Sequence, residues 1–143
     1  MTVTTPADAS AVPLPLITPV SRPFWDGCRE GVLRIQRCCG CGLFRFYPSE
    51  SCHACASTES VWTELSGRGR IASWIVVHRS VDPAWAARVP FATGVVEIEE
   101  QPGCLIPGLI EGAPPATLRA GQPVEIGFER VSESVALPRW RVR

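Results

Sequence analysis

The chain has 143 residues, of which 45% are hydrophobic and 20% charged, and its formal net charge is zero. This length fits one domain, or a small module joined to a domain. Zero net charge argues against a nucleic-acid-binding protein, and the complete lack of lysine excludes an enzyme that uses its own lysine as a Schiff base or general base.

Residues 1–20 are rich in threonine, alanine and proline and are expected to lack regular structure on their own. They form either a flexible tail or an extended arm whose Leu14, Leu16 and Ile17 pack on a partner. The segment has no basic residue and its apolar part is broken by prolines, which does not fit a signal peptide. No apolar run reaches the length of a membrane span. We therefore expect a cytoplasmic protein, in which paired cysteines bind metal or do redox chemistry rather than form disulfides.

A short helix is predicted after this arm. Ser21 is suited to cap it, Pro23 falls in its first turn, and Asp26 lies near its positive start. Gly27 and Gly31 weaken the helix by about 1 kcal/mol each relative to alanine, so it needs to dock on something. Phe24, Cys28 and Val32 fall on one apolar face of the helix, with Trp25 beside them. This face packs either on the chain's own core or on a ligand or partner.

Two C-x-x-C motifs follow, Cys38 with Cys41 and Cys52 with Cys55, separated by ten residues. Two such turns facing each other present four thiolates in a tetrahedral arrangement, which selects zinc, or less often iron. All four coordination positions are then filled, so we expect one structural zinc ion per chain rather than a catalytic one. The alternatives are a disulfide pair or four unrelated buried thiols. A redox dithiol requires only one C-x-x-C, so the second motif favours a metal.

The cysteines lie within a predicted zinc ribbon. Residues 33–37 alternate between apolar and polar and predict a strand that leads into the first cysteine turn, and residues 43–47 form the return strand. Gly40 and Gly42 provide the turn conformation of the first knuckle. Ala56 stands where Gly42 stands in the first knuckle, so we expect a more strained second knuckle. Cys39 and His53 are alternative ligands that the spacing does not favour.

From residue 66 onward the sequence predicts only strands, so the fold class is mainly β. Glycine- and proline-rich turns separate the strands, and an OB-type five-stranded barrel fits their number and the remaining length. The loop 80–90 carries Trp85 and Arg88, which either pack on the barrel or anchor a partner. The five predicted strands span residues 70–79, 91–99, 105–110, 124–131 and 137–142.

Catalytic motifs are scarce. The chain has two histidines, His53 and His78, and its isolated cysteines Cys28 and Cys104 have no histidine close in sequence. There is no phosphate-binding loop, and residues 67–69 are too short for a dinucleotide fingerprint. These observations favour a binding or scaffold protein.

Short segments follow one another in a fixed order along residues 21–142: the helix with residues 23–25, residues 33–38, both cysteine pairs, residues 66–69, residues 77–78, residues 90–91, residues 121–124 and residues 137–140. Together they resemble the DUF35 family, which combines a rubredoxin-like zinc ribbon with an OB-fold. The family more often has proline and glycine at the positions of His53 and Ala56.

The resemblance implies a domain order, a ligand set and a kind of partner. Residues 1–20 are the arm, residues 21–65 the helix and zinc ribbon, and residues 66–143 the OB-fold barrel. The metal ligands are Cys38, Cys41, Cys52 and Cys55.

The partner is expected to be a thiolase-like enzyme, that is a thiolase, an acyltransferase or a retro-aldolase of steroid side-chain degradation, which acts on acyl-CoA and carries the catalytic residues. We expect contacts with it, or with acyl-CoA, at Phe24, Trp25, Trp85 and Arg88. A stand-alone acyl-CoA-binding protein is the second hypothesis and a nucleic-acid-binding protein the third.

Overall fold

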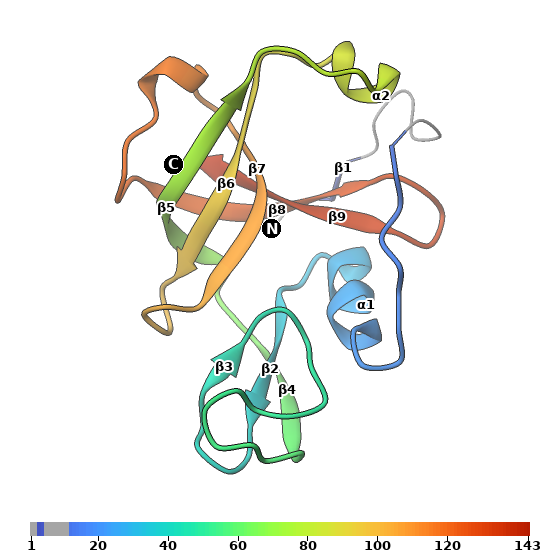
Figure 1. Ribbon diagram of the computed structural model, residues 1–143, viewed down its shortest axis with the longest axis vertical. Helices are drawn as coiled ribbons and strands as arrows, with labels where there is room; N and C mark the ends of the chain where they lie inside the picture. The colour runs from blue at the N-terminus through green and yellow to red at the C-terminus, as the bar shows by residue number, and fades with distance from the viewer. Residues whose placement is uncertain (1–2, 5–11) are drawn as a thin grey trace.

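The computed structural model describes residues 3–4 and 12–143, so most of the N-terminal arm expected at residues 1–20 lies outside the described residues. Figure 1 shows a small lower sheet and a larger upper sheet, with one helix beside their junction. In chain order the elements are β1 (Val3–Thr4), α1 (Arg22–Glu30), β2 (Arg34–Cys38), β3 (Phe44–Arg45), β4 (Ser60–Glu64), β5 (Arg68–Val77), α2 (Pro83–Ala86), β6 (Phe91–Ile98), β7 (Leu105–Glu111), the 3-10 turn η2 (Pro115–Thr117), β8 (Pro123–Arg130) and β9 (Ala136–Val142).

The larger sheet closes into a five-stranded barrel. Its strands follow the order β8-β5-β6-β7-β9, and β9 pairs again with β8 to complete the ring. All of these pairings are antiparallel except that of β7 with β9, and β1 adds to the free edge of β8 in parallel. This confirms the predicted mainly β class and OB-type barrel, with strand bounds within two residues of those expected.

The barrel interior is filled by the alternate residues of its strands, as period-2 patterning requires. Trp140 is fully buried at its centre, and its indole N–H donates to the Ile106 carbonyl oxygen at 3.2 Å. Val96, Val124 and Phe128 belong to the same buried cluster, with at most 1% of their surface exposed. Phe24 and Cys28 of α1 belong to the same buried cluster, so the helix packs on the barrel's own core.

The smaller sheet is the ribbon, with strand order β3-β2-β4. The predicted return strand at residues 43–47 is shorter than expected, since only Phe44–Arg45 pairs with β2. Strand β4 was not predicted, although Val61, Trp62 and Thr63 are residue types that favour strands. It pairs with β2 along its whole length and connects the ribbon to the barrel.

Helix α1 lies where it was predicted, but two of its expected starting signals are absent. Ser21 occupies the N-cap position, yet its hydroxyl accepts from Thr18 N–H at 3.0 Å instead of capping the helix. Asp26 lies beyond the first turn. The helix ends at Gly31, which adopts φ +80°, so Val32 lies outside it.

Gly27 contributes to this packing rather than only weakening the helix. A Cβ atom at Gly27 would lie 2.7 Å from the Val32 carbonyl oxygen, and the Gly27 carbonyl accepts from Val32 N–H at 2.8 Å. The chain turns back over Gly27 as it enters β2, which only glycine allows at this distance.

Gln101, in the turn between β6 and β7, joins the barrel to the ribbon. Its amide oxygen accepts from Phe44 N–H and its amide nitrogen donates to the Phe44 carbonyl oxygen, both at 2.8 Å. One side chain therefore pairs with the outer edge of β3 as another strand would. Within the part of the chain that is described, no helix is long and apolar enough to cross a bilayer.

Candidate metal centre and adjoining apolar groove

Four cysteine sulfur atoms gather at the end of the ribbon. The Sγ atoms of Cys38, Cys41, Cys52 and Cys55 all lie within 4.8 Å of one another. The closest pairs are Cys38 with Cys55 at 3.5 Å and Cys41 with Cys52 at 3.6 Å. A tetrahedral ion with bonds of about 2.3 Å to sulfur requires sulfur atoms about 3.8 Å apart. The four thiols are therefore placed to hold one metal ion with no coordination position left open.

Two turns of closely similar backbone present these sulfurs. In the first, Gly42 N–H donates to the Cys38 carbonyl oxygen at 3.0 Å and Gly40 N–H reaches Cys38 Sγ at 3.3 Å. In the second, Ala56 N–H donates to the Cys52 carbonyl oxygen at 2.9 Å and Ala54 N–H reaches Cys52 Sγ at 3.4 Å. Each turn thus directs backbone N–H groups at its first cysteine, as a bound thiolate requires.

The electrostatics differ between the first and second cysteine of each turn. The N–H groups, that of Cys41 first, lower the pKa of the Cys38 thiol to about 6. The Cys55 N–H and then the Ala54 N–H lower the pKa of Cys52 in the same way. At Cys41 the Leu43 N–H also lowers the pKa, but burial and the neighbouring sulfurs outweigh it and raise the pKa to about 11. A metal ion removes this difference by supplying positive charge to all four sulfurs.

The other cysteines and the histidines stand apart from this cluster. Cys39 and His53 are exposed, and within the described chain neither belongs to the group of four sulfurs. Burial raises the pKa of Cys28, which is fully buried on the inner face of α1, and raises the pKa of Cys104 to about 11. His78 is exposed at the end of β5. The two buried thiols are therefore protonated core residues at neutral pH.

An apolar groove of about 360 Å³ opens where α1, the ribbon and the barrel meet. Trp25 forms one wall, and its indole N–H donates to the Tyr47 hydroxyl at 2.9 Å. Phe24 and Phe46 pack edge to face behind them with ring centroids 5.2 Å apart. On the opposite wall lie residues of the barrel and of α2: Trp85, Thr93, Pro107, Gly108, Leu109, Leu137, Pro138 and Arg139.

Three of the four contact residues expected from the sequence, Phe24, Trp25 and Trp85, line this groove. Phe24 is fully buried, so it supports the wall without offering surface of its own. Trp85 also packs on the barrel, with its ring centroid 5.3 Å from that of Phe91. Tyr47 was missed, although it is the only tyrosine of the chain and 47% exposed.

The fourth expected contact residue, Arg88, lies in the adjoining cavity beside Trp85. Its guanidinium lies 5.3 Å from the centroid of the Trp85 ring and 3.5 Å from the carboxylate of Glu129. Glu129 is 5% exposed and also forms an ion pair with Arg139. Burial lowers the pKa of Arg139. This buried network holds the loop that carries α2 against the barrel.

Family models of known proteins match both parts of the chain. Residues 25–61 match the ChsH2 rubredoxin-like zinc ribbon domain, and residues 62–129 match the ChsH2 C-terminal OB-fold domain. The boundary between the two matches falls within β4, the strand that runs from the ribbon into the barrel.

Two curated relatives each match more than two thirds of this chain. The 3-oxo-4,17-pregnadiene-20-carboxyl-CoA hydratase alpha subunit of Mycobacterium tuberculosis is 35% identical over 105 residues, which are 73% of this chain and 32% of that protein. A DUF35 domain-containing scaffold protein of Methanocaldococcus jannaschii is 34% identical over 99 residues, which are 68% of this chain and 67% of that protein. The chain spans about a third of the length of the hydratase alpha subunits that it matches.

A solved structure has the same architecture. The chain is similar to one in a structure described as Ltp2-ChsH2(DUF35) aldolase, with a TM-score of 0.80 and 27% sequence identity over 90% of this chain and 98% of that one.

Proposed function

Since the chain belongs to the DUF35 family, we propose that it is a non-catalytic subunit of an enzyme complex that acts on acyl-CoA. The single observation that carries this proposal is the likeness to the chain from the Ltp2-ChsH2(DUF35) aldolase structure along almost its full length. The hydratase alpha subunit and the scaffold protein among the relatives agree with a supporting role. In this proposal the partner is a thiolase-like enzyme, such as a thiolase, an acyltransferase or a retro-aldolase of steroid side-chain or aromatic degradation.

The metal in this proposal is zinc. Four thiolates at tetrahedral spacing favour zinc over harder or octahedral ions, and iron is the less favoured alternative. The ligands are Cys38, Cys41, Cys52 and Cys55, and the ion supplies structural cross-linking of the ribbon, since these four fill every position.

The contact surface that we propose for the partner is the apolar groove. Tyr47 and Trp85 present aromatic side chains, which carry much of the binding energy at protein interfaces. Trp25 is only 8% exposed and supports Tyr47 through its indole N–H. Arg88 extends this surface from the adjoining cavity. The proposed division of the chain is an arm at residues 1–20, the helix and ribbon at residues 21–65, and the barrel at residues 66–143.

Co-expression with thiolase-like proteins encoded beside this chain tests the proposal. We expect one of them to co-purify with the tagged chain and to elute with it from a size-exclusion column. Tyr47→Ala removes a half-exposed ring from the groove and should weaken this complex, whereas Val61→Ala, 51% exposed on the ribbon edge, should not. A chain that remains alone with every such partner contradicts the proposal.

A stand-alone acyl-CoA-binding protein is the second candidate, because the groove is apolar and large enough for an acyl chain. Titration of the isolated chain with acyl-CoAs of different length distinguishes the two. Saturable binding below the millimolar range that Tyr47→Ala weakens supports this candidate, and its absence rejects it.

We also propose a cytoplasmic location. All seven cysteines are free thiols in the structure, which suits a reducing compartment where thiolates are available for a metal.

A further inference from the structure

On the outer face of the barrel, strand register arranges charged residues in rows across β6, β5, β8 and β9. Directly opposite residues on paired strands point to the same side of a sheet. One row consists of Glu97 on β6, Arg70 on β5 and Pro123 on β8, joined by the pairings of Arg70 with both neighbours. Arg143 continues the row, since its N–H donates to the Pro123 carbonyl oxygen at 3.2 Å.

The neighbouring row alternates in charge from end to end. Arg68 lies opposite Glu125 on β8, and Glu125 lies opposite Arg141 on β9. On the other side Arg68 forms an ion pair with Glu99 at 2.7 Å. Every arginine in this row therefore has a carboxylate as its neighbour, an arrangement that stabilises adjacent strands.

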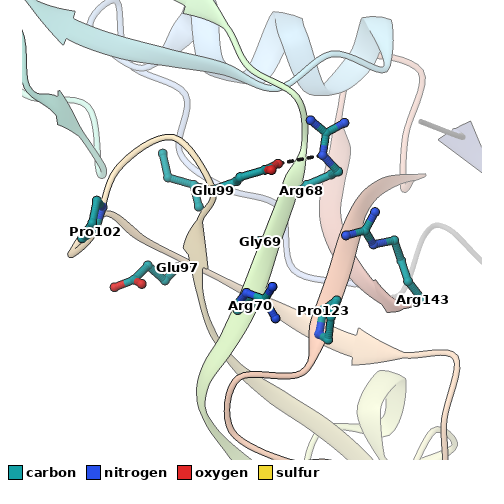
Figure 2. Close-up of a pocket in the computed structure, with 9 residues that line it drawn as sticks. Arg68, Gly69, Arg70, Glu97, Glu99, Pro102, Pro123 and Arg143 are labelled. Atoms are coloured by element: carbon teal, nitrogen blue, oxygen red, sulfur yellow. Dashed lines mark hydrogen bonds and ion pairs between the residues drawn. The ribbon is translucent and has the colours of Figure 1, made fainter.

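The first row lacks one negative charge. Pro123 stands between Arg70 and Arg143, at the position that Glu125 occupies in the neighbouring row. Glu97 accepts from Gly103 N–H at 2.9 Å and is directed away from the arginines, as Figure 2 shows. Among the described residues, neither Arg70 nor Arg143 forms an ion pair with a carboxylate.

A cavity of about 180 Å³ lies over this gap and is lined by both arginines and Pro123, together with Glu97 and the ion-paired Arg68 and Glu99. Figure 2 shows Arg70 and Arg143 on either side of the proline ring. Arg70 is oriented by its bond to the Gly121 carbonyl oxygen at 3.0 Å, which leaves its other donors available. The volume exceeds that of several waters at about 30 Å³ each, so one oxyanion fits.

We propose that this cavity is a phosphate-binding site, with Arg70 and Arg143 as the two ligand residues. The cavity lining holds three arginines and two carboxylates, and Glu99 is already paired with Arg68. The two guanidinium groups that form no ion pair in the described part of the chain match a phosphate monoester, which carries a charge of about −1.5 to −2 at neutral pH, better than a carboxylate with one charge. The planar guanidinium also offers the paired donors that phosphate oxygens accept. The site does not depend on the acyl-CoA function proposed above, but that function suggests one source of the phosphate, the nucleotide end of coenzyme A.

The test is an amide chemical-shift titration of the metal-loaded full chain with inorganic phosphate, against chloride at equal ionic strength. We expect saturable shifts confined to residues around Arg70, Val124 and Arg143. Arg70→Gln and Arg143→Gln should each weaken binding about three- to fivefold, as expected for exposed ion pairs. Pro123→Glu places a carboxylate in the gap and should abolish binding.

Arg141→Gln is the matched control, because it removes the same charge from the same strand end but in the neighbouring row. It should leave the affinity within about twofold. Shifts scattered over all arginine surfaces, or full affinity in Arg70→Gln and in Pro123→Glu, would overturn the proposal.

Titration with coenzyme A and with dephospho-coenzyme A distinguishes the sources. Tighter binding of coenzyme A than of dephospho-coenzyme A supports the site and identifies the nucleotide phosphate as its ligand. Equal affinities for coenzyme A and inorganic phosphate support a site for the free ion. No localised shift with any of the three compounds rejects the site. Because no partner is present, this failure is separate from a failure of the proposed complex.

Discussion

The ribbon and the barrel are stabilised by different means. In the barrel, alternate residues of every strand meet around Trp140, and the buried cluster extends from β5 to β9. In the ribbon, Leu33 and Ile35 join that cluster, but within the described chain no residue from 47 to 61 does. The second cysteine turn therefore depends on metal coordination and hydrogen bonds, whereas the barrel depends on apolar burial. Removing the metal and removing core volume should therefore disorder different parts of one chain.

The largest expected effect is that of removing a metal ligand. Cys38→Ser should abolish metal binding and disorder β2, β3 and β4, because metal coordination in such modules contributes on the order of 10 kcal/mol. Hydrogen exchange should show loss of amide protection in the ribbon, with protection retained in β6 and β7. Cys39→Ser, one position away and exposed, should behave as the wild type. Protected ribbon amides in metal-free Cys38→Ser would contradict this division.

Removing core volume should destabilise the barrel and leave metal binding intact. Trp140→Ala deletes the largest fully buried side chain, and a loss of about 3–5 kcal/mol in the free energy of unfolding is expected. Denaturant unfolding measures this loss, and a competing chelator should still report one metal ion per chain where the protein remains folded. Trp74→Ala, on the same sheet but only partly buried at the edge of the core, should cost clearly less. Equal losses for both tryptophans would contradict the assigned core.

Several features followed from the sequence because they have local causes. The cysteine spacing predicted the grouping of the four sulfur atoms, and the strand periods and glycine-rich turns predicted the barrel strands to within two residues. The helix was located by Pro23 and its apolar face, although Ser21 bonds to Thr18 instead of capping it.

Other features depend on which segments meet in space. Strand β4 forms because β2 lies beside it. Tyr47 lines the groove where it meets Trp25 and Phe24 of the distant helix α1, and the gap at Pro123 appears only once three strands are in register. A single sequence has no local pattern that predicts these contacts, because they join residues far apart along the chain.

The next effect concerns the junction of the two regions. Gln101→Ala leaves the N–H and carbonyl of Phe44 without their partner, which should cost about 1–3 kcal/mol. Gln101→Glu keeps the acceptor but sets a carboxylate oxygen against the Phe44 carbonyl oxygen, so its loss should be at least as large. Unfolding measurements should show this order of stability, together with faster hydrogen exchange at Phe44 in both variants. Wild-type exchange at Phe44 in Gln101→Ala would show that the junction is held by other contacts.

The smallest expected effect comes from the residue with positive φ in each of the two cysteine turns. Gly42 has φ +77° and Ala56 has φ +63°, and Ala56 is the only described residue other than glycine with positive φ. A left-handed conformation costs an alanine about 1–2 kcal/mol, whereas glycine adds about 0.4–1 kcal/mol of freedom to the unfolded chain. The first quantity is the larger, so Ala56→Gly should stabilise the ribbon by about 0.5–1 kcal/mol.

Gly42→Ala is the reciprocal change and isolates the same cause. A Cβ atom at Gly42 would have the Arg37 guanidinium as its nearest neighbour at 3.7 Å, an ordinary contact, so the variant suffers from backbone conformation alone. Its loss should therefore match the gain from Ala56→Gly in size, and the double variant should return to wild-type stability in thermal unfolding of the metal-loaded protein. A gain from Ala56→Gly without a matching loss from Gly42→Ala would mean that the two turns, alike in hydrogen bonding, carry different strain.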